Sequence, residues 1–237
     1  MASLLYLCVR PERGAADAEH ASFRRALGVE ELDRIDLLDE PLPDEALQHH
    51  RAVVIGGSPY NVTDSDKSPT QRRVEADLAR LAQHAVEGRI AAFFTCYGIG
   101  VVTRMLGGEV VLDHPEQATA ARVTTTPEAD ADPVFGPSTP GFEVFTAHKE
   151  GSTVPPPGAV LLATGPVCPV QAYRVGTHLY ATQFHPEPTP QDFADRMTFY
   201  RSTGYFDATL FEHVQAQVLA SAVTGDALLR RFAQTFL

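Results

Sequence analysis

Residues 51–94 read RAVVIGGSPYNVTDSDKSPTQRRVEADLARLAQHAVEGRIAAFF, which contains a strand, a helix and a second strand in that order. The strands are the short apolar runs at residues 51–55 and 89–94, which are typical of buried strands. The helix between them has apolar side chains at helical spacing: Val74, Leu78, Leu81 and Ala85. A strand–helix–strand unit predicts a parallel sheet that is covered by helices.

The pattern changes in the second half of the chain. Over residues 108–185, short β-like runs are divided by turn residues, with a clear break at the PPPG of residues 155–158. A helical pattern returns at residues 190–202. We therefore predict an α/β fold with a mostly parallel central sheet and an additional antiparallel β section. One domain is expected over residues 1–205, with a C-terminal helical extension, residues 206–237, packed on it.

Composition limits the partners that the chain can have. Its 237 residues, 44% hydrophobic and 21% charged, suit a globular domain with a buried core. A net charge of −11 disfavours nucleic acid, because phosphate binding needs a basic surface. No run of about 18 apolar residues exists, so no membrane span is expected. The apolar start at residues 3–9 is interpreted as a buried strand rather than a signal peptide.

Three cysteines, Cys8, Cys96 and Cys168, have no metal-like spacing. An odd number of cysteines predicts a reducing, cytoplasmic environment and leaves room for one reactive thiol. With no cluster of cysteines or carboxylates at ligand spacing, we predict no metal site.

The segment FFTCYGIG, residues 93–100, places Cys96 between an apolar strand and a helix-like segment. A nucleophile on such a turn is lifted clear of the sheet, and the N-terminus of the following helix offers N–H groups and a positive field. These N–H groups can bind the oxyanion that forms when a carbonyl is attacked. Gly98 suits the turn because a bulky side chain would crowd it. A small core residue is the alternative interpretation of Cys96, and the preferred one for Cys8 and Cys168.

Residues 181–187 read ATQFHPE, so a β-like run ends in His185 and a carboxylate, Glu187, follows two positions later. The proline between them makes their relation stiff. A histidine beside a cysteine can act as general base, and a carboxylate behind it selects its tautomer. Because ligands collect at the carboxyl ends of strands in an open parallel sheet, Cys96 and His185 are expected to converge. Taken alone, a His-Pro-Glu segment is also compatible with a plain turn.

A third segment, VVIGGSPYNVTD at residues 53–64, ends a buried strand in Gly56 and Gly57. Glycine lets the backbone approach a ligand closely, and a free N–H here could form half of an oxyanion hole. Neither the P-loop nor the dinucleotide spacing is present, which disfavours a phosphate cradle. A plain turn is the alternative.

Together, GGSPY, TCYG and FHPE, in this order and at predicted strand ends, resemble the class I glutamine amidotransferases. The resemblance is to stand-alone members similar to the amidotransferase domain of GMP synthase, and it runs from about residue 50 to 190. It implies a flavodoxin-like three-layer sandwich and a small-molecule substrate, with no cofactor. It also implies that a cysteine attacks the side-chain amide of glutamine, that a γ-glutamyl thioester forms and that ammonia leaves.

By position, the resemblance implies roles for single residues. Cys96 would be the nucleophile, His185 the base and Glu187 the orienting acid. Gly57 and Tyr97 would supply the N–H groups of the oxyanion hole. His148 stands where relatives often have a histidine followed two residues on by an acid, and a pocket wall or loop anchor is its expected role. The expected substrate-binding residues are Gly56, Ser58, Gly98, Gly100, His148 and Phe184.

The chain departs from the family pattern at two positions. Members usually carry glycine two residues before the cysteine, where this chain has Phe94, and glutamine four residues after it, where this chain has Gly100. Since that glutamine helps to hold the substrate in many relatives, three functions stay open. They are a glutaminase that feeds ammonia to a synthetase on another chain, a free-standing hydrolase of γ-glutamyl peptides or conjugates, and a non-catalytic binding or regulatory module.

Overall fold

A computed structural model describes residues 3–201 and 210–237. The strands are β1 (Ser3–Cys8), β2 (Asp33–Asp36), β3 (His50–Ile55), β4 (Ala91–Thr95), β5 (Glu116–Thr125), β6 (Gly141–His148), β7 (Ala159–Thr164), β8 (Ala172–Val175) and β9 (Leu179–Thr182). The α-helices are α1 (Arg13–Leu27), α2 (Asp44–His49), α3 (Pro69–Val86), α4 (Tyr97–Met105), α5 (Pro190–Phe199), α6 (Phe211–Leu219) and α7 (Asp226–Phe236). Two short 3-10 turns, Pro127–Ala129 and Gly136–Ser138, lie between β5 and β6.

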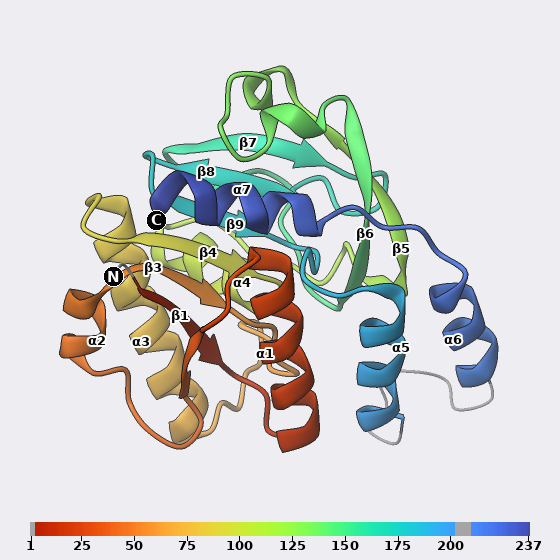
Figure 1. The fold of residues 1–237 in the computed structure, drawn as a ribbon, viewed down its shortest axis with the longest axis horizontal. Coiled ribbons are helices and arrows are strands. Elements are labelled where there is room, and N and C mark those ends of the chain that lie inside the picture. The colour runs from red at the N-terminus through yellow and green to blue at the C-terminus, as the bar shows by residue number, and fades with distance from the viewer. Residues whose placement is uncertain (1–2, 202–209) are drawn as a thin grey trace.

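The nine strands form one sheet with a parallel half and an antiparallel half (Figure 1). Its strand order is β2-β1-β3-β4-β9-β8-β7-β5-β6. From β2 to β9 every pairing is parallel, and this half has the 2-1-3-4-5 order of doubly wound sheets with β9 in the last place. The strand–helix–strand unit predicted over residues 51–94 is confirmed, because β3 and β4 pair in parallel and are joined through α3.

The expectation of a mostly parallel sheet is not confirmed. From β9 to β6 the four pairings are all antiparallel, as many as in the parallel half. Chain length explains part of this outcome. Only residues 176–178 connect β8 to β9, whereas a crossover between parallel strands needs about a dozen residues. The sheet is therefore mixed, and the expected antiparallel section is half of it.

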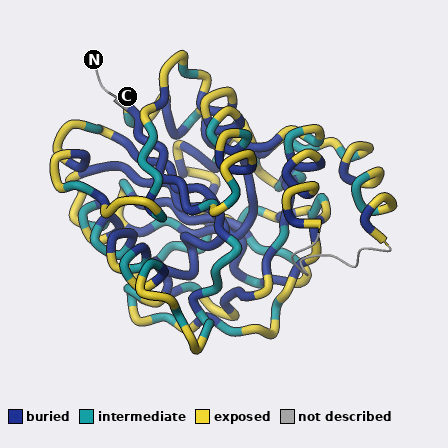
Figure 2. Tube along the Cα trace, turned by 90° about the horizontal axis from the view of Figure 1, so that it is seen from below, coloured by how far each residue is buried: buried dark blue, intermediate teal, exposed yellow. Residues whose placement is uncertain are grey.

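Helices cover both faces of the sheet, which gives three layers. One apolar cluster lies between the sheet and α2, α3 and α4, and it includes the predicted stripe of α3, all of which is buried. A second cluster lies under α1 and α7 and contains Phe23 and Phe232. A third, smaller cluster joins α5 and α6 to β5 and β6. Figure 1 shows α1 and α7 on the same side of the sheet, and Figure 2 shows the buried strands as a dark-blue centre within exposed turns.

The C-terminal helices pack on the rest of the molecule. α7 packs against α1, and α6 packs against α5 beside the sheet (Figure 1). Thr189 caps α5, since its hydroxyl accepts from the backbone of Asp192 while the Asp192 carboxylate accepts from the backbone of Thr189. The predicted domain boundary between residues 205 and 206 lies outside the described residues. No described helix is both long enough and apolar enough to cross a membrane.

Candidate active site

Cys96 lies on the sharp turn between β4 and α4. Its backbone has φ 49° and ψ −104°, and no other described residue except glycine has a positive φ. Such strained turns are used to present nucleophiles, because they raise the side chain above the end of the strand. The backbone N–H of Cys96 donates to the carbonyl of Thr182 at 2.8 Å, which ties the turn to the neighbouring strand β9. The predicted strand-to-helix turn is confirmed.

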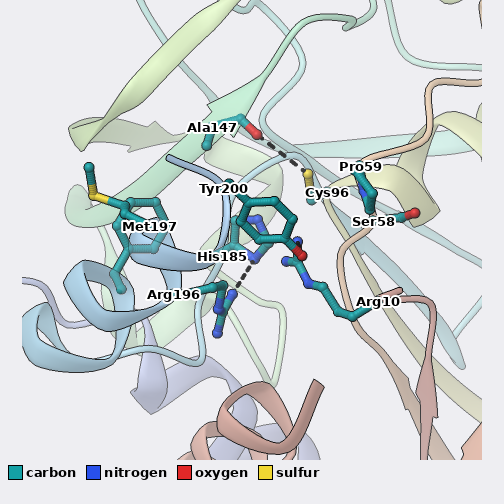
Figure 3. Close-up of a pocket in the computed structure, with 10 residues that line it drawn as sticks. Arg10, Ser58, Pro59, Cys96, Ala147, His185, Arg196, Met197 and Tyr200 are labelled. Atoms are coloured by element: carbon teal, nitrogen blue, oxygen red, sulfur yellow. Dashed lines mark hydrogen bonds between the residues drawn. The ribbon is translucent and has the colours of Figure 1, made fainter. Parts of the chain in front are cut away.

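His185 follows β9, the strand next to β4, so the two side chains meet at one edge of the sheet. The backbone N–H of His185 donates to the carbonyl of Phe145 at 2.8 Å, which fixes the loop. The ring is 4% exposed, and its Nδ1 lies 3.1 Å from Oε1 of Glu187, whose side chain is fully buried. The Cys96 thiol donates to the carbonyl oxygen of Ala147, and the sulfur and oxygen atoms lie 3.8 Å apart (Figure 3). Cys96 and His185, which the sequence led us to expect at neighbouring strand ends, line one cavity, and Glu187 contacts the ring of His185.

The charges around His185 favour its protonated form. Burial by itself lowers the pKa of the ring, but the charges of Glu187 and Cys96 outweigh it and raise the pKa to about 9. Burial likewise raises the pKa of Glu187, yet the positive charges of His185 and Arg196 hold it down at about 2. At neutral pH the imidazole is therefore protonated and the carboxylate behind it is ionised.

A buried network of charges extends this row beyond the predicted residues. Nη1 of Arg196 donates to Oε1 of Glu187 at 2.7 Å and to Oε1 of Glu19 at 3.1 Å. Nη2 of Arg10 donates to the same oxygen of Glu19 at 2.8 Å, and the hydroxyl of Tyr6 donates to its Oε2 at 2.7 Å. Each carboxylate thus meets at least one guanidinium, as buried charges require. The guanidinium of Arg196 thus fixes the carboxylate of Glu187, and the carboxylate of Glu19 in turn fixes the guanidinium.

Sequence reasoning missed Arg10, Glu19 and Arg196. A signal was present on two helices, because a charged residue falls within a buried face on each. Glu19 lies at helical spacing from Ala15, Ala16 and Phe23 on α1, and all four are buried. Arg196 lies between the buried Phe193 and Met197 on α5. A charge inside an apolar stripe indicates a buried partner, although it does not tell which residue that partner is.

Two cavities adjoin the thiol of Cys96. The first has a volume of about 40 Å³ and is lined by Cys96 and His185 together with mostly apolar side chains of α5 and its surroundings (Figure 3). The second is narrower, about 10 Å³, and is lined by Cys96, Tyr97 and polar side chains. Ser58 lines both cavities. The thiol is thus reached from an apolar side that holds the imidazole and from a polar side that holds the N-terminus of α4.

The family model for glutamine amidotransferase class-I matches residues 27–202 of the chain. The chain belongs to the class I glutamine amidotransferase family. Among curated relatives, GMP synthase (glutamine-hydrolyzing) of Ectopseudomonas mendocina is 30% identical over 177 residues, which cover 70% of this chain and 30% of that protein. The enzyme of the same name from Herminiimonas arsenicoxydans is 29% identical over 154 residues, which cover 62% and 27%. The chain thus spans less than a third of the length of these relatives.

The fold agrees with this family. A glutamine amidotransferase from Thermotoga maritima superposes with a TM-score of 0.76 at 17% identity, covering 99% of this chain and 97% of that one. A glutamine amidotransferase from Methylobacillus flagellatus superposes with a TM-score of 0.69 at 20% identity, covering 98% and 91%. At these identities the likeness concerns the fold.

The backbone N–H of Gly57, which the resemblance assigned to the oxyanion hole, has a different acceptor in this structure. The backbone N–H of Gly57 donates to Oε1 of Glu19 at 3.3 Å, so it belongs to the charge network. Ser58, one residue later, lines both cavities beside Cys96, and its backbone N–H has no acceptor in the described part of the chain. Tyr97 is the first residue of α4, where backbone N–H groups have no partner within the helix. Ser58 and Tyr97 thus both lie beside Cys96 in the lining of the polar cavity.

Both departures from the family pattern have a physical counterpart. A Cβ on Gly98 would lie 3.0 Å from Cβ of Phe94, so the bulky residue before the turn and the glycine after it fit each other. A Cβ on Gly100 would lie 3.1 Å from a methyl group of Val62 and 3.2 Å from Oε1 of Glu150. The space that a family glutamine would enter is therefore filled.

Glu150 fills that space and anchors the loop after β3. Its carboxylate accepts hydrogen bonds from the backbone N–H groups of Val62 at 2.8 Å and Thr63 at 2.9 Å, and from the Thr63 hydroxyl at 2.9 Å. Burial raises the pKa of Glu150, and these hydrogen bonds oppose that effect. The carboxylate holds the loop that contains Ser58 against the N-terminal part of α4.

The other predicted residues divide into two groups. His148 lines the polar cavity, and both its ring nitrogens are engaged, by Oε2 of Glu116 at 2.7 Å and the carbonyl of Glu150 at 2.8 Å. This is the anchoring role expected of it. Phe184 is fully buried against Phe142 and lines neither cavity. Gly56, Gly98 and Gly100 line neither cavity and serve as points of close packing.

Three of the buried groups, Glu19, His185 and Glu187, have ligand atoms within 4.8 Å of one another. Such a set could hold a metal ion if it were open. Here the same carboxylate oxygens accept hydrogen bonds from Arg10 and Arg196. Positive charge is already supplied by the two guanidinium groups, so the donor set does not fit a cation.

Proposed function

We propose that the chain hydrolyses the side-chain amide of glutamine, or of a γ-glutamyl relative, through a thioester on Cys96. One observation carries the proposal: Cys96 and His185 line the same cavity, and Oε1 of Glu187 lies 3.1 Å from Nδ1 of His185. A thiol, an imidazole and a carboxylate in this relation form a nucleophile, its base and the group that orients the base.

In the first step, the Cys96 sulfur bonds to the amide carbon and its proton is held by His185. The negative charge that moves to the amide oxygen is stabilised by the backbone N–H groups of Ser58 and Tyr97. Glu187 keeps a proton on Nδ1, so that Nε2 is the nitrogen that exchanges protons with the reacting groups. Arg196 keeps Glu187 ionised and fixed in place.

In the second step, the carbon–nitrogen bond breaks and His185 donates its proton to the leaving nitrogen. Ammonia departs when the substrate is glutamine, and a γ-glutamyl thioester remains. Water then attacks the thioester carbon, and His185 takes one of its protons. The carbon–sulfur bond breaks, glutamate leaves and the proton returns to the sulfur. The raised pKa of His185 keeps a proton available for the leaving nitrogen at neutral pH.

The amino-acid end of the substrate would lie in the polar cavity. Asn61, Lys149 and Gln183 line it, and they provide a cation and amide groups for an α-carboxylate and an α-ammonium. At about 10 Å³ the polar cavity holds about one water-sized group. Its walls must therefore open when the amino-acid end of the substrate binds. These residues would take the place of the family glutamine that Gly100 replaces.

Labelling tests this function directly. A glutamine analogue with a diazoketone in place of the amide should add once to the protein, as seen by mass spectrometry of the intact chain. Cys96→Ala should lose the adduct, whereas Cys8→Ala and Cys168→Ala, at two other buried free cysteines, should keep it. A wild-type chain that neither takes the label nor releases glutamate from any γ-glutamyl compound would identify a non-catalytic member.

We infer a second candidate function for the case in which glutamine is the substrate: the ammonia released here would be used by a synthetase on a separate chain. The support is that the matched relatives are named GMP synthases and are more than three times the length of the matched region. The rate of glutamate release should rise when a synthetase encoded beside this chain is added. An unchanged rate, with every such candidate, would favour a hydrolase that works alone.

A further inference from the structure

We propose that the preferred substrate is a γ-glutamyl amide whose nitrogen carries a compact apolar group, and that this group binds in the apolar cavity beside Cys96. The inference rests on the proposed function, since it takes the thioester chemistry as given. It replaces glutamine, whose leaving group is ammonia, with a substrate that releases a small alkylamine.

Proton transfer decides which cavity receives the leaving group. The group that protonates the leaving nitrogen must lie within hydrogen-bond reach of it, and that group is His185. His185 lines the apolar cavity, whereas the described lining of the polar cavity includes Tyr97 and not His185. A substituent on the leaving nitrogen therefore points into the apolar cavity, and the γ-glutamyl chain points into the polar one. Ammonia alone would leave the apolar cavity unfilled.

The lining of the apolar cavity matches a hydrocarbon group. One wall of the cavity consists of Phe193, Met197 and Tyr200. Pro59 and Ala147 also line the cavity. Figure 3 shows Met197 and Tyr200 on one side of the thiol and Pro59 on the other. Phe193 and Met197 are held rigidly, because Phe193 stacks on Phe145 with ring centroids 4.5 Å apart and both side chains are buried.

Two arginines also border the cavity, but their charges are directed elsewhere. Arg10 and Arg196 bind the carboxylates of Glu19 and Glu187, so their positive charge is balanced without a ligand. Nε and Nη2 of Arg196 have no acceptor among residues 3–201 and 210–237, and both atoms are buried. An uncharged substituent therefore suits this cavity better than one that carries a carboxylate.

The size of the cavity limits the substituent. At about 40 Å³, the cavity holds roughly three water-sized groups, since each needs about 10–15 Å³. The leaving nitrogen uses part of this space. A group of about two carbon atoms fills the remainder, and a branched group of four carbon atoms exceeds it unless a wall residue is shortened.

A substrate series tests this reading with glutamine, γ-glutamylmethylamide, γ-glutamylethylamide and γ-glutamylisobutylamide. Glutamate release should give the highest kcat/KM with the ethylamide, at about fourfold for each buried carbon, and a fall at the isobutylamide. γ-Glutamylalanine and γ-glutamylvaline are the matched controls, because they add only a carboxylate to the ethyl and isobutyl compounds. Each should be at least tenfold slower than its partner.

A variant of the wall gives a second, independent readout. Met197→Ala should enlarge the cavity and move the highest kcat/KM from the ethylamide to the isobutylamide. Met105→Ala is the matched control, because Met105 is a partly buried methionine on α4 that lines neither cavity. It should leave the ratio of the two rates unchanged. The ratio of the kcat/KM values for two substrates, measured on one protein sample, does not depend on how much of that sample is folded.

The outcomes separate the two proposals. Fast turnover of glutamine with every alkylamide slower would overturn the apolar leaving group and leave the thioester chemistry standing. Faster turnover of γ-glutamylvaline than of the isobutylamide would overturn it in favour of γ-glutamyl peptides. Absence of glutamate release from all six compounds, with no adduct on Cys96, would overturn the proposed function itself.

Discussion

Two turns hold the reacting side chains, and they do so by different means. Cys96 is positioned by its backbone, because β4 runs directly into α4 through a residue with φ 49°. His185 is positioned by side-chain charges, since its ring contacts Glu187, Glu187 contacts Arg196, and Arg196 contacts Glu19. A turn of the first kind depends on a few neighbouring residues. The row of charges that positions His185 depends on contacts between separate segments of the chain. We therefore expect distant substitutions to displace the imidazole of His185 and to leave the thiol of Cys96 in place.

The largest effect is expected at the thiol. Cys96→Ala should lower kcat for γ-glutamyl hydrolysis by on the order of 10⁶-fold, because nucleophile and base act as one unit. The fold should remain, since the residue is small and the turn is set by the backbone. Glutamate release, followed together with the thermal midpoint, measures both effects. Retention of a tenth of the activity would mean that the nucleophile is another residue.

Loss of the carboxylate behind the imidazole should have the next largest effect. Glu187→Gln should lower kcat/KM by about 10²–10⁴-fold, because the amide no longer selects the tautomer of His185 or balances its charge. Glu143→Gln, at a half-exposed carboxylate on β6, is a control that should stay near the wild-type rate. If the two variants are equally active, Glu187 does not orient the base.

The buried row of charges formed by Glu19, Arg196 and Glu187 should contribute to the free energy of unfolding. Arg196→Met leaves Glu19 and Glu187 buried with less compensation, and should lower the free energy of unfolding by about 3–5 kcal/mol. Glu19→Gln should also destabilise. The double variant should be less destabilised than the sum of the two single variants by about 1 kcal/mol or more, because the residues are in contact. Urea unfolding of the four proteins measures the difference, and strict additivity would show that the contact has no energetic weight.

Stability should depend on pH through His185. A pKa raised from 6.5 to about 9 means that the folded chain binds this proton more tightly than the unfolded chain. Its contribution is complete below about pH 6.5 and is lost as pH rises through 9. The free energy of unfolding should therefore fall between pH 7 and pH 9.5, and His185→Gln should remove most of that slope. A slope that is unchanged in the variant would assign it to other groups.

The smallest expected effect concerns backbone strain at the thiol. Cys96→Gly should be more stable than Cys96→Ala by about 1 kcal/mol, because glycine adopts a positive φ without steric cost. Both variants lack the thiol, so activity does not enter the comparison. Equal unfolding free energies of the two variants in urea would show that the positive φ at residue 96 costs alanine no more than glycine.

The contrast also explains what could be predicted from the sequence. The turn at Cys96 was predictable because strand, cysteine and helix follow one another along the chain. That Cys96 and His185 line one cavity was predictable because each follows a strand, and the two strands, β4 and β9, are neighbours. Arg196 and Glu19 were not, because they lie 177 residues apart and only packing of α1 near α5 brings them together.

The hydrogen-bond partners of the backbone N–H groups in the loop after β3 could not be predicted from the sequence either. Gly56, Gly57 and Ser58 are consecutive, and the letters alone do not tell which N–H faces the thiol. The buried carboxylate of Glu19 accepts from the N–H of Gly57, which leaves the N–H of Ser58 for the proposed oxyanion hole. The division of the sheet was missed for a similar reason. Short β-like runs predict strands, whereas their order and direction are set by contacts between distant segments.

One face of α5 carries two duties at once. Phe193 and Met197 line the apolar cavity. Arg196 lies on the same turns of the helix and donates a hydrogen bond to Glu187. A rigid displacement of α5 would therefore widen the cavity and loosen the base in a single movement. New substrate ranges in this scaffold are reached more safely by exchanging the side chains at 193 and 197 one at a time than by shifting the helix that bears them.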